Sequence, residues 1–194
     1  IFKIINITFF NFLIFFLIPT YSMGFLIVEK IKLSQANIIK RYNHDPSAFT
    51  QGLVYQNEHF FESTGGWGTS KIIKINKNTG KVTNFKKLLP KYFGEGITIY
   101  DNKIFQVTWK SKKGFVYDIN NFALLDEFKI YGQGWGLAND GKSLILSDGS
   151  EKIYFLNPKN FEVEKTISVS LNGNKQMLIN ELEFIRGEIW ANIW

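Results

Sequence analysis

The chain of 194 residues contains no cysteine and two histidines, His44 and His59. Without cysteine it cannot form disulfides, so its stability has to come from a hydrophobic core or from closure of the fold. The same shortage excludes a catalytic zinc site of familiar ligand spacing, because such sites draw on cysteine and histidine. No stretch shows convincing helical periodicity, which favours an all-β chain. With 45% hydrophobic residues, the sequence can still bury one sizeable core.

Long apolar runs are missing everywhere except at the start. Residues 1–24 contain one charge, Lys3, followed by a mostly apolar run over residues 4–18 and then by small and polar residues. This order is typical of a secretory signal peptide, and the run is shorter than the roughly 20 apolar residues of a membrane span. We therefore predict a cleaved leader at residues 1–24 and an extracytoplasmic domain, periplasmic or secreted, at residues 25–194. An uncleaved anchor is the alternative.

The clustered charge of a nucleic-acid-binding surface is also missing. The formal net charge is +6, but the lysines are scattered among apolar residues at strand-like spacing, as in Lys71, Lys74, Lys77, Lys81, Lys86 and Lys87. A nucleic-acid groove would gather its positive charge in one patch. The pattern predicts a solvated face on a monomer that binds neither nucleic acid nor, after leader cleavage, a membrane.

What the chain does contain is a repeat. From Phe49 onward, an apolar leading segment, a tight polar turn and further short strands recur at intervals of 40 to 45 residues. The leading segments are residues 51–55, 95–99, 135–138 and 181–184. Asparagine, aspartate and glycine stand in the turns that follow them, where a hairpin requires such residues. A period in the low forties with four strands per unit is the signature of a β-propeller.

The repeat is incomplete. Its fourth unit stops after the second strand, at Trp194. A propeller removes its sheet edges by closing a ring, and about three and a half blades are too few to do so. We expect the chain to be a fragment that lacks the C-terminal part of the ring, and residues 25–42 to supply a closing strand for the final blade. A natural open array of this length is the alternative.

The stretch Phe93-Gly94-Glu95-Gly96 is unusual for a strand. Glycine weakens a strand interior unless something must approach the backbone closely, and we expect these glycines to leave room for a substrate. A carboxyl group with aromatic neighbours is a candidate for a raised pKa, because burial disfavours its charged form. A turn with a solvated acid is the alternative interpretation of these four residues.

Four side chains occupy equivalent or adjacent positions in the leading segments of the four repeats: Gln51, Glu95, Trp135 and Asn180. Leading strands line the central channel of a propeller. We therefore expect these side chains to converge near the axis of the ring.

Eight motifs follow one another from about Tyr42 to the last residue. They are residues 44–53 (HDPSAFTQGL), 62–65 (ESTG), 93–97 (FGEGI), 108–110 (TWK), 134–137 (GWGL), 147–150 (SDGS), 180–183 (NELE) and 191–194 (ANIW). In this order they resemble the plant-type glutaminyl-peptide cyclotransferases (glutaminyl cyclases), which also occur in bacteria. The resemblance implies a five-bladed β-propeller with four-stranded antiparallel blades. It implies an enzyme that converts the N-terminal glutamine of peptides or proteins to pyroglutamate and releases ammonia.

Carried over position by position, the catalytic glutamate of this family falls on Glu95. The resemblance implies a substrate-binding aromatic box and two orienting amides: Phe49, Phe93, Trp109, Trp135 and Trp194, with Gln51 and Asn180. It implies no metal ligand and no cofactor required for catalysis, and a structural metal ion in the channel is left open. The reaction is intramolecular, so one carboxylate that alternates between base and acid suffices to move the proton from the attacking amine to the leaving nitrogen.

Two alternatives stand beside this assignment. The first is a non-catalytic extracytoplasmic propeller that binds peptides or sugars through the same aromatic channel. The second is a truncated, inactive homologue. Paired acids such as Glu181 and Glu183 also occur in metal sites and glycosidases, but here they belong to a shared motif and are interpreted as structural.

Overall fold

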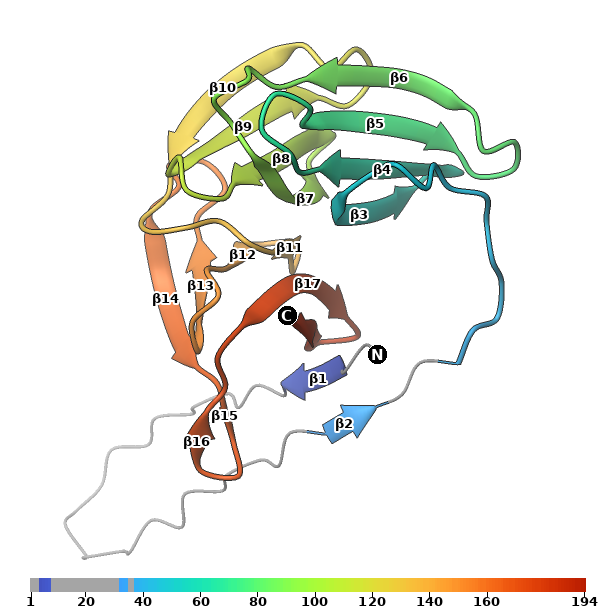
Figure 1. The fold of residues 1–194 in the computed structure, drawn as a ribbon. Coiled ribbons are helices and arrows are strands. Elements are labelled where there is room, and N and C mark those ends of the chain that lie inside the picture. The colour runs from blue at the N-terminus through green and yellow to red at the C-terminus, as the bar shows by residue number, and fades with distance from the viewer. Residues whose placement is uncertain (1–3, 8–31, 35–36) are drawn as a thin grey trace, which may run out of the picture.

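The computed structural model describes residues 4–7, 32–34 and 37–194. These residues form strands, turns and loops (Figure 1). Among them no helix is long and apolar enough to cross a membrane. Apart from Ile4–Ile7, the predicted leader lies outside the described residues.

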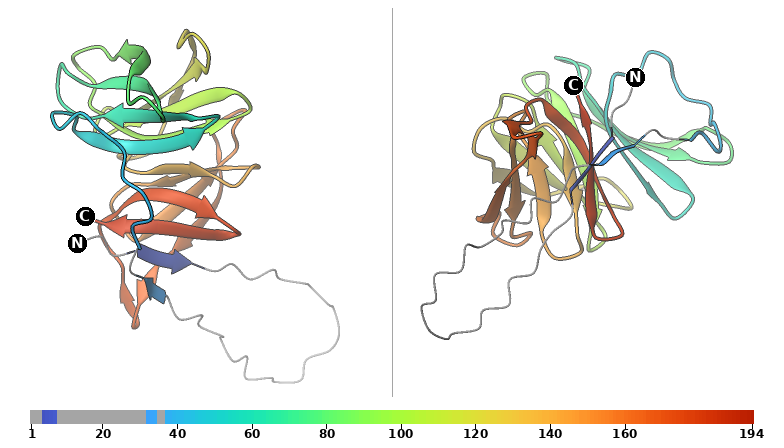
Figure 2. Two further views of the ribbon diagram at one scale, coloured as in Figure 1. Left: turned by 90° about the vertical axis from the view of Figure 1, so that its right-hand side faces the viewer. Right: turned by 90° about the horizontal axis from the view of Figure 1, so that it is seen from below.

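Four antiparallel sheets of four strands each follow one another around an axis (Figures 1 and 2). The first is β3 (Thr50–Gln56), β4 (His59–Thr64), β5 (Lys71–Asn76) and β6 (Val82–Lys87). The second is β7 (Gly94–Tyr100), β8 (Lys103–Thr108), β9 (Lys113–Asp118) and β10 (Leu124–Lys129). The third is β11 (Leu137–Asn139), β12 (Leu144–Ser147), β13 (Lys152–Leu156) and β14 (Val163–Ser168). The fourth is β17 (Ile179–Ile185), β18 (Glu188–Ile193), β1 (Ile4–Ile7) and β2 (Lys32–Ser34), and a small hairpin, β15 (Ser170–Leu171) with β16 (Asn174–Lys175), precedes it.

This arrangement confirms an all-β, propeller-like fold built from four-stranded antiparallel sheets. Each of the first three sheets is a meander in which every strand pairs with the next one in the chain. The predicted hairpin turns have the backbone that they need: φ is positive at both Asp101 and Asn102, and at both Arg186 and Gly187. Two-residue turns with positive φ match the twist of the strands that they join.

The fourth sheet differs from the expectation that it would stop after two strands. β1 pairs with β18 and β2 pairs with β1, so two short N-terminal segments complete the sheet. β1 comes from the predicted leader. β2 comes from the predicted closing segment but joins the fourth sheet beside β1, not a final fifth one. The physical reason is that an edge strand such as β18 presents unpaired backbone groups, which pair with any strand that reaches them.

Three hydrophobic layers hold the neighbouring sheets together. Phe61 and Ile97 belong to the layer between the first and second sheets, Leu137 to the next, and Ile189 to the layer between the third and fourth. The described residues form no comparable layer between the fourth sheet and the first. On that side, Phe85 of β6 is 56% exposed, and the chain from β2 to β3 runs past the opening (Figure 1).

Glycines allow the leading strands of successive sheets to touch. A Cβ on Gly52 would lie 2.8 Å from the backbone nitrogen of Ile97, and one on Gly96 would lie 2.6 Å from the carbonyl oxygen of Trp135. A Cβ on Gly136 would meet the backbone of β17 in the same way. The expectation that the glycines on both sides of Glu95 leave room for a substrate is therefore wrong at Gly96. The space is filled by the backbone of the next sheet, because the strands are closest together near the axis.

Candidate functional site

An irregularity at the same level of three leading strands sets the position of the site. The pairing of β3 with β4, of β7 with β8 and of β17 with β18 shifts register, and each time the leading strand has one extra residue. The shifts fall at Gln51, at Glu95-Gly96 and at Asn180-Glu181. Such bulges bend a strand and redirect a side chain, and they are common next to active sites. The bulges therefore place the three predicted polar site residues.

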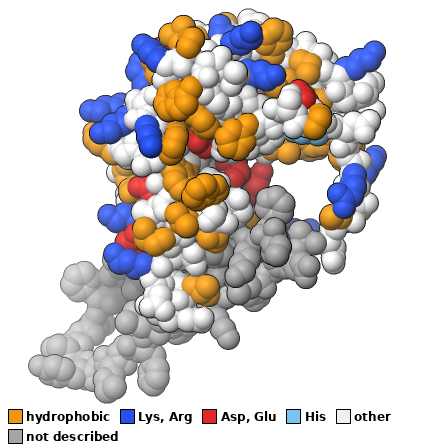
Figure 3. Space-filling model, in the orientation of Figure 1, with side chains coloured by type: hydrophobic (Ala, Val, Ile, Leu, Met, Phe, Trp, Pro, Cys, Tyr) orange, Lys and Arg blue, Asp and Glu red, His pale blue; other side chains and the backbone are white. Residues whose placement is uncertain are grey.

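All eight predicted site residues line one cavity of about 300 Å³. Three of them lie in leading strands of three sheets and the other five lie just before or after strands: Phe49, Gln51, Phe93, Glu95, Trp109, Trp135, Asn180 and Trp194. The four residues that were expected to converge from the leading segments do so. On the face seen in Figure 3, acidic side chains appear in a central hollow, hydrophobic side chains surround it, and lysine and arginine lie at the periphery.

Aromatic rings form the walls of the cavity. Phe93 packs edge-to-face against Trp109 at a centroid distance of 5.5 Å and against Phe49 at 6.0 Å. Trp67, which is not among the predicted site residues, packs on the same ring at 5.6 Å from outside the cavity. Trp135 and Trp194 pack against each other at 6.0 Å. Edge-to-face contacts favour fixed ring orientations, so the walls have a defined shape.

The Trp135 ring is held from two directions. Its Nε1 donates to Oε1 of Gln133 at 3.1 Å. Its face covers Gly149, where a Cβ would lie 2.6 Å from the ring. The turn that contains Gly149 is fixed by Asp148, whose Oδ1 accepts from the Ser150 backbone nitrogen at 3.0 Å. This turn thus supports a wall of the cavity.

Glu95 is the titratable group inside the cavity. Its side chain is buried, with 7% of the residue exposed, and none of the described side chains hydrogen-bonds to it. Burial among aromatic rings raises its pKa from 4.5 to about 8. The expected raised pKa is confirmed by this geometry. A carboxyl group with such a pKa can both accept and return a proton near neutral pH.

A second acid near the axis was interpreted as structural. Burial, together with the charges of Glu183 and Glu95, raises the pKa of Glu181 well above its usual range. Its Oε2 is buried and has no hydrogen-bond partner among the described residues, as is true of Nε1 of Trp190 and Oδ1 of Asn192. These three side chains line a cavity of about 480 Å³ between the fourth and first sheets, where a neighbouring group could pair with them.

The donor set does not suggest a metal centre. No three histidine, cysteine, aspartate or glutamate residues in the described part of the chain are grouped so that they could hold a metal ion.

The chain was compared with known proteins. The model of the glutamine cyclotransferase family matches residues 16–194. A glutaminyl-peptide cyclotransferase from Arabidopsis thaliana is 42% identical over 165 residues, which is 84% of this chain and 52% of that protein. The chain thus spans about half the length of this curated relative.

Solved structures agree with the sequence comparison. The crystal structure of Myxococcus xanthus glutaminyl cyclase is 34% identical with a TM-score of 0.75, over 81% of this chain and 67% of that one. The Neurospora crassa Pan2 WD40 domain, at 12% identity and a TM-score of 0.59 over 73% and 41% of the two chains, shares the fold alone. With a family model that covers nearly all of its length and a relative of this identity, the chain belongs to the glutamine cyclotransferase family.

Proposed function

We propose that the protein is a glutaminyl-peptide cyclotransferase that converts the N-terminal glutamine of peptides or proteins to pyroglutamate and releases ammonia. The observation that carries the proposal is Glu95, a carboxyl group with a pKa of about 8 inside an aromatic cavity. Family membership supports it, because the related Arabidopsis protein is a glutaminyl-peptide cyclotransferase.

The reaction joins two groups of one residue. The lone pair of the substrate's α-amine attacks its side-chain amide carbon, and the amine nitrogen loses a proton to the Glu95 carboxylate. Glu95 then returns this proton to the amide nitrogen, the bond between carbon and that nitrogen breaks, and ammonia leaves. The product is a five-membered lactam, and the carboxylate is regenerated. Holding both groups in place supplies much of the rate, and general acid–base help adds about 10²- to 10⁴-fold.

The remaining cavity residues bind and orient the substrate in this proposal. The rings of Phe93, Trp109 and Trp135 surround the short alkyl stem of the glutamine and exclude water, so that ring closure outcompetes hydrolysis. Gln51 and Asn180 each offer a donor and an acceptor, which suits the amide group and the peptide backbone. The chemistry needs protein side chains only, and no cofactor.

We also propose that the full-length protein is a monomeric five-bladed ring. The chain covers 52% of the Arabidopsis relative and 67% of the Myxococcus one, which leaves length for a fifth sheet. A sheet between the fourth and the first would cover the exposed Phe85 and reach the polar atoms of Trp190 and Asn192 that have no partner among the described residues. Cleavage of a leader at residues 1–24 would remove β1 and free the edge of β18 for a third strand of the fourth sheet. The mass of the mature, exported protein and its size on gel filtration test these points.

Ammonia release from a glutaminyl dipeptide, measured with a coupled enzyme assay on the full-length protein, tests the activity. Glu95→Gln keeps the shape of the side chain and removes its ability to take a proton. We expect this variant to lose at least about 10²-fold in kcat while it still binds the peptide. A variant as fast as the wild type would refute the role of Glu95. A wild-type protein that binds glutaminyl peptides without releasing ammonia would instead indicate a binding protein.

A further inference from the structure

A buried carboxyl group outside the catalytic cavity has no role in the proposed reaction. The side chain of Glu62 is 1% exposed, and the residue lies on β4 between Leu53 of β3 and Ile73 of β5. An ionised carboxylate is costly to bury unless it is paired and hydrogen-bonded. Two partners of Glu62 come from the segment that leads into the cavity.

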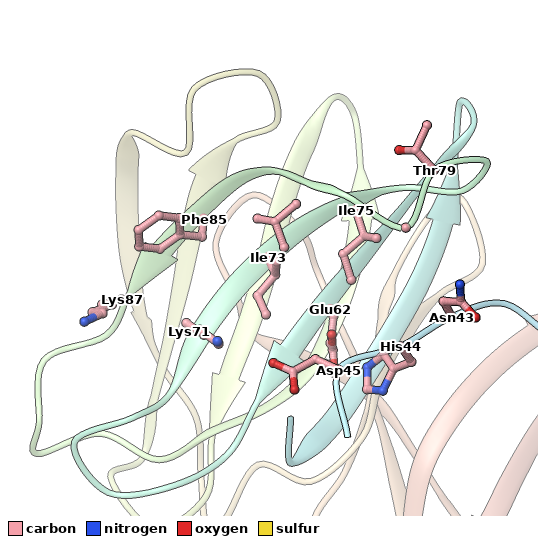
Figure 4. A pocket seen from close by; sticks show the side chains of 12 residues that line it. Asn43, His44, Asp45, Glu62, Lys71, Ile73, Ile75, Thr79, Phe85 and Lys87 are labelled. Atoms are coloured by element: carbon pink, nitrogen blue, oxygen red, sulfur yellow. Dashed lines mark hydrogen bonds and ion pairs between the residues drawn. The ribbon is translucent and has the colours of Figure 1, made fainter. Parts of the chain in front are cut away.

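Both partners contact the same oxygen of Glu62. The Thr50 hydroxyl donates to Oε1 at 2.5 Å, and Nε2 of His44 lies 2.9 Å from Oε1. Figure 4 shows His44 beside Glu62 at the edge of a groove of about 630 Å³ on the face of the first sheet that points away from the second. Residues 44–50 are thus attached at both ends to one buried oxygen.

The residues between the two attachment points form a tight turn. The Ala48 backbone nitrogen donates to the carbonyl oxygen of Asp45 at 3.1 Å. Oδ1 of Asp45 accepts from the backbone nitrogen and the hydroxyl of Ser47, at 2.9 and 2.7 Å. Pro46 occupies the second position of this turn, where its fixed φ is favourable. These hydrogen bonds and Pro46 restrict the loop to few conformations. Its attachment at Glu62 therefore fixes the position of the residues that follow it.

The extra residue of β3 links this attachment to the cavity. Side chains of paired residues share a face, and the shift at Gln51 places Thr50 on the same face as Leu53 and Glu62. Without the extra residue, the Thr50 hydroxyl would point toward the second sheet. Phe49 and Gln51 flank Thr50 in the chain, and both line the cavity.

We propose that His44, Thr50 and Glu62 form a latch that positions Phe49 and Gln51 for binding of the glutaminyl residue. The inference rests on the proposed function and adds three positioning residues to it. The proton-transferring carboxyl group lies on the second sheet, so opening the latch weakens substrate binding and leaves proton transfer intact. A mutation that removes only binding shared by ground state and transition state raises KM without changing kcat.

Thr50→Val removes the hydroxyl from the latch at nearly constant volume. The matched control is Thr83→Val, which removes a hydroxyl that donates to the carbonyl oxygen of Lys74 at 3.2 Å on the outer strand of the same sheet. We expect Thr50→Val to raise KM about tenfold, which corresponds to about 1.4 kcal/mol, with kcat per folded enzyme within about twofold of the wild type. Glu62→Gln should change KM in the same direction, and the control should change neither constant.

These two constants separate a latch from a merely structural contact. A structural contact, once lost, lowers the fraction of folded enzyme and leaves KM where it was. An unchanged KM in Thr50→Val, measured with the folded fraction known from its unfolding curve, would overturn the proposal.

Amide hydrogen exchange tests the latch independently of catalysis. Residues 45–52 should exchange faster in Thr50→Val than in the wild type and the control, while the third sheet exchanges as before. If the wild-type protein releases no ammonia from a glutaminyl peptide, the proposed function fails and exchange alone decides about the latch. Unchanged exchange over residues 45–52 would refute it whether or not the protein is an enzyme.

Discussion

Replacing Glu95 by glutamine should remove activity and, at alkaline pH, stabilise the fold. Burial raises the pKa of this carboxyl group from 4.5 to about 8. A group whose pKa is higher in the folded state favours folding in its protonated form. Its contribution is therefore complete below about pH 4.5 and is lost as the pH rises through about 8. Glutamine copies the shape of the protonated acid and does not titrate.

The size of the effect follows from the two pKa values. A change from 4.5 to about 8 corresponds to about 5 kcal/mol once the carboxyl group is fully ionised. Between about pH 5 and pH 9, the wild type should lose about 4 kcal/mol of unfolding free energy that the variant keeps. Burial also raises the pKa of Glu181, but that residue is present in both proteins and its contribution largely cancels in the difference.

Urea unfolding of both proteins at about pH 5, 7 and 9 measures this difference. Glu162→Gln, at an exposed acid on the surface, is the control. The difference in unfolding free energy between wild type and Glu95→Gln should increase with pH. The difference between wild type and the control variant should stay constant. If the difference in unfolding free energy between wild type and Glu95→Gln does not change with pH, the ionised Glu95 side chain does not destabilise the folded state, and the reasoning is refuted.

Five further outcomes are expected. Because Glu95 has to be ionised to accept the amine proton, kcat/KM should rise up to about pH 8 and level off above it; a profile that is flat from about pH 6 to 9 would contradict this. Gly96→Ala should lower the unfolding free energy by about 3 kcal/mol or more, since its Cβ would lie 2.6 Å from a carbonyl oxygen of the next sheet. Gly141→Ala should cost only about 1 kcal/mol in the same urea assay, from its positive φ alone, and equal losses would count against the close approach of the strands. Gly149→Ala should push the Trp135 ring out of place and raise KM more than it lowers kcat, so that an unchanged KM would speak against this support of the ring. Treatment with a chelator such as EDTA should leave ammonia release unchanged, and activity that is lost and then restored by a metal ion would contradict a mechanism based on side chains alone.

Local signals made much of the fold predictable. Strands of three to seven residues alternate with turns that contain residues tolerant of positive φ, as at Asp101-Asn102 and Gly187, and both signals are present in the sequence itself. The regular spacing of the leading segments then placed Gln51 and Asn180 at one level along the axis of the sheets. The aromatic residues of the cavity were predicted from the order of the motifs. Local sequence would not have identified them, because a single tryptophan in a strand is more often part of a core.

Contacts between distant segments were not predictable. The close approach to Gly96 comes from the backbone of the next repeat, and its presence cannot be read from the residues around the glycine. The pairing of Glu62 with His44 and Thr50 depends on a one-residue register shift, and no local sequence pattern indicates this shift. The addition of β1 and β2 to the fourth sheet depends likewise on which segment reaches an open edge.

The extra residues in the leading strands have a consequence for how such a ring can change its chemistry. A side chain at a bulge has no partner of its own directly across the ladder, so replacing it leaves every cross-strand pair intact. Gln51 and Asn180 can therefore vary at little cost to the sheets that bear them. A library randomised at these two bulge positions should retain a high proportion of folded members, and substrate range could be selected from it separately from stability.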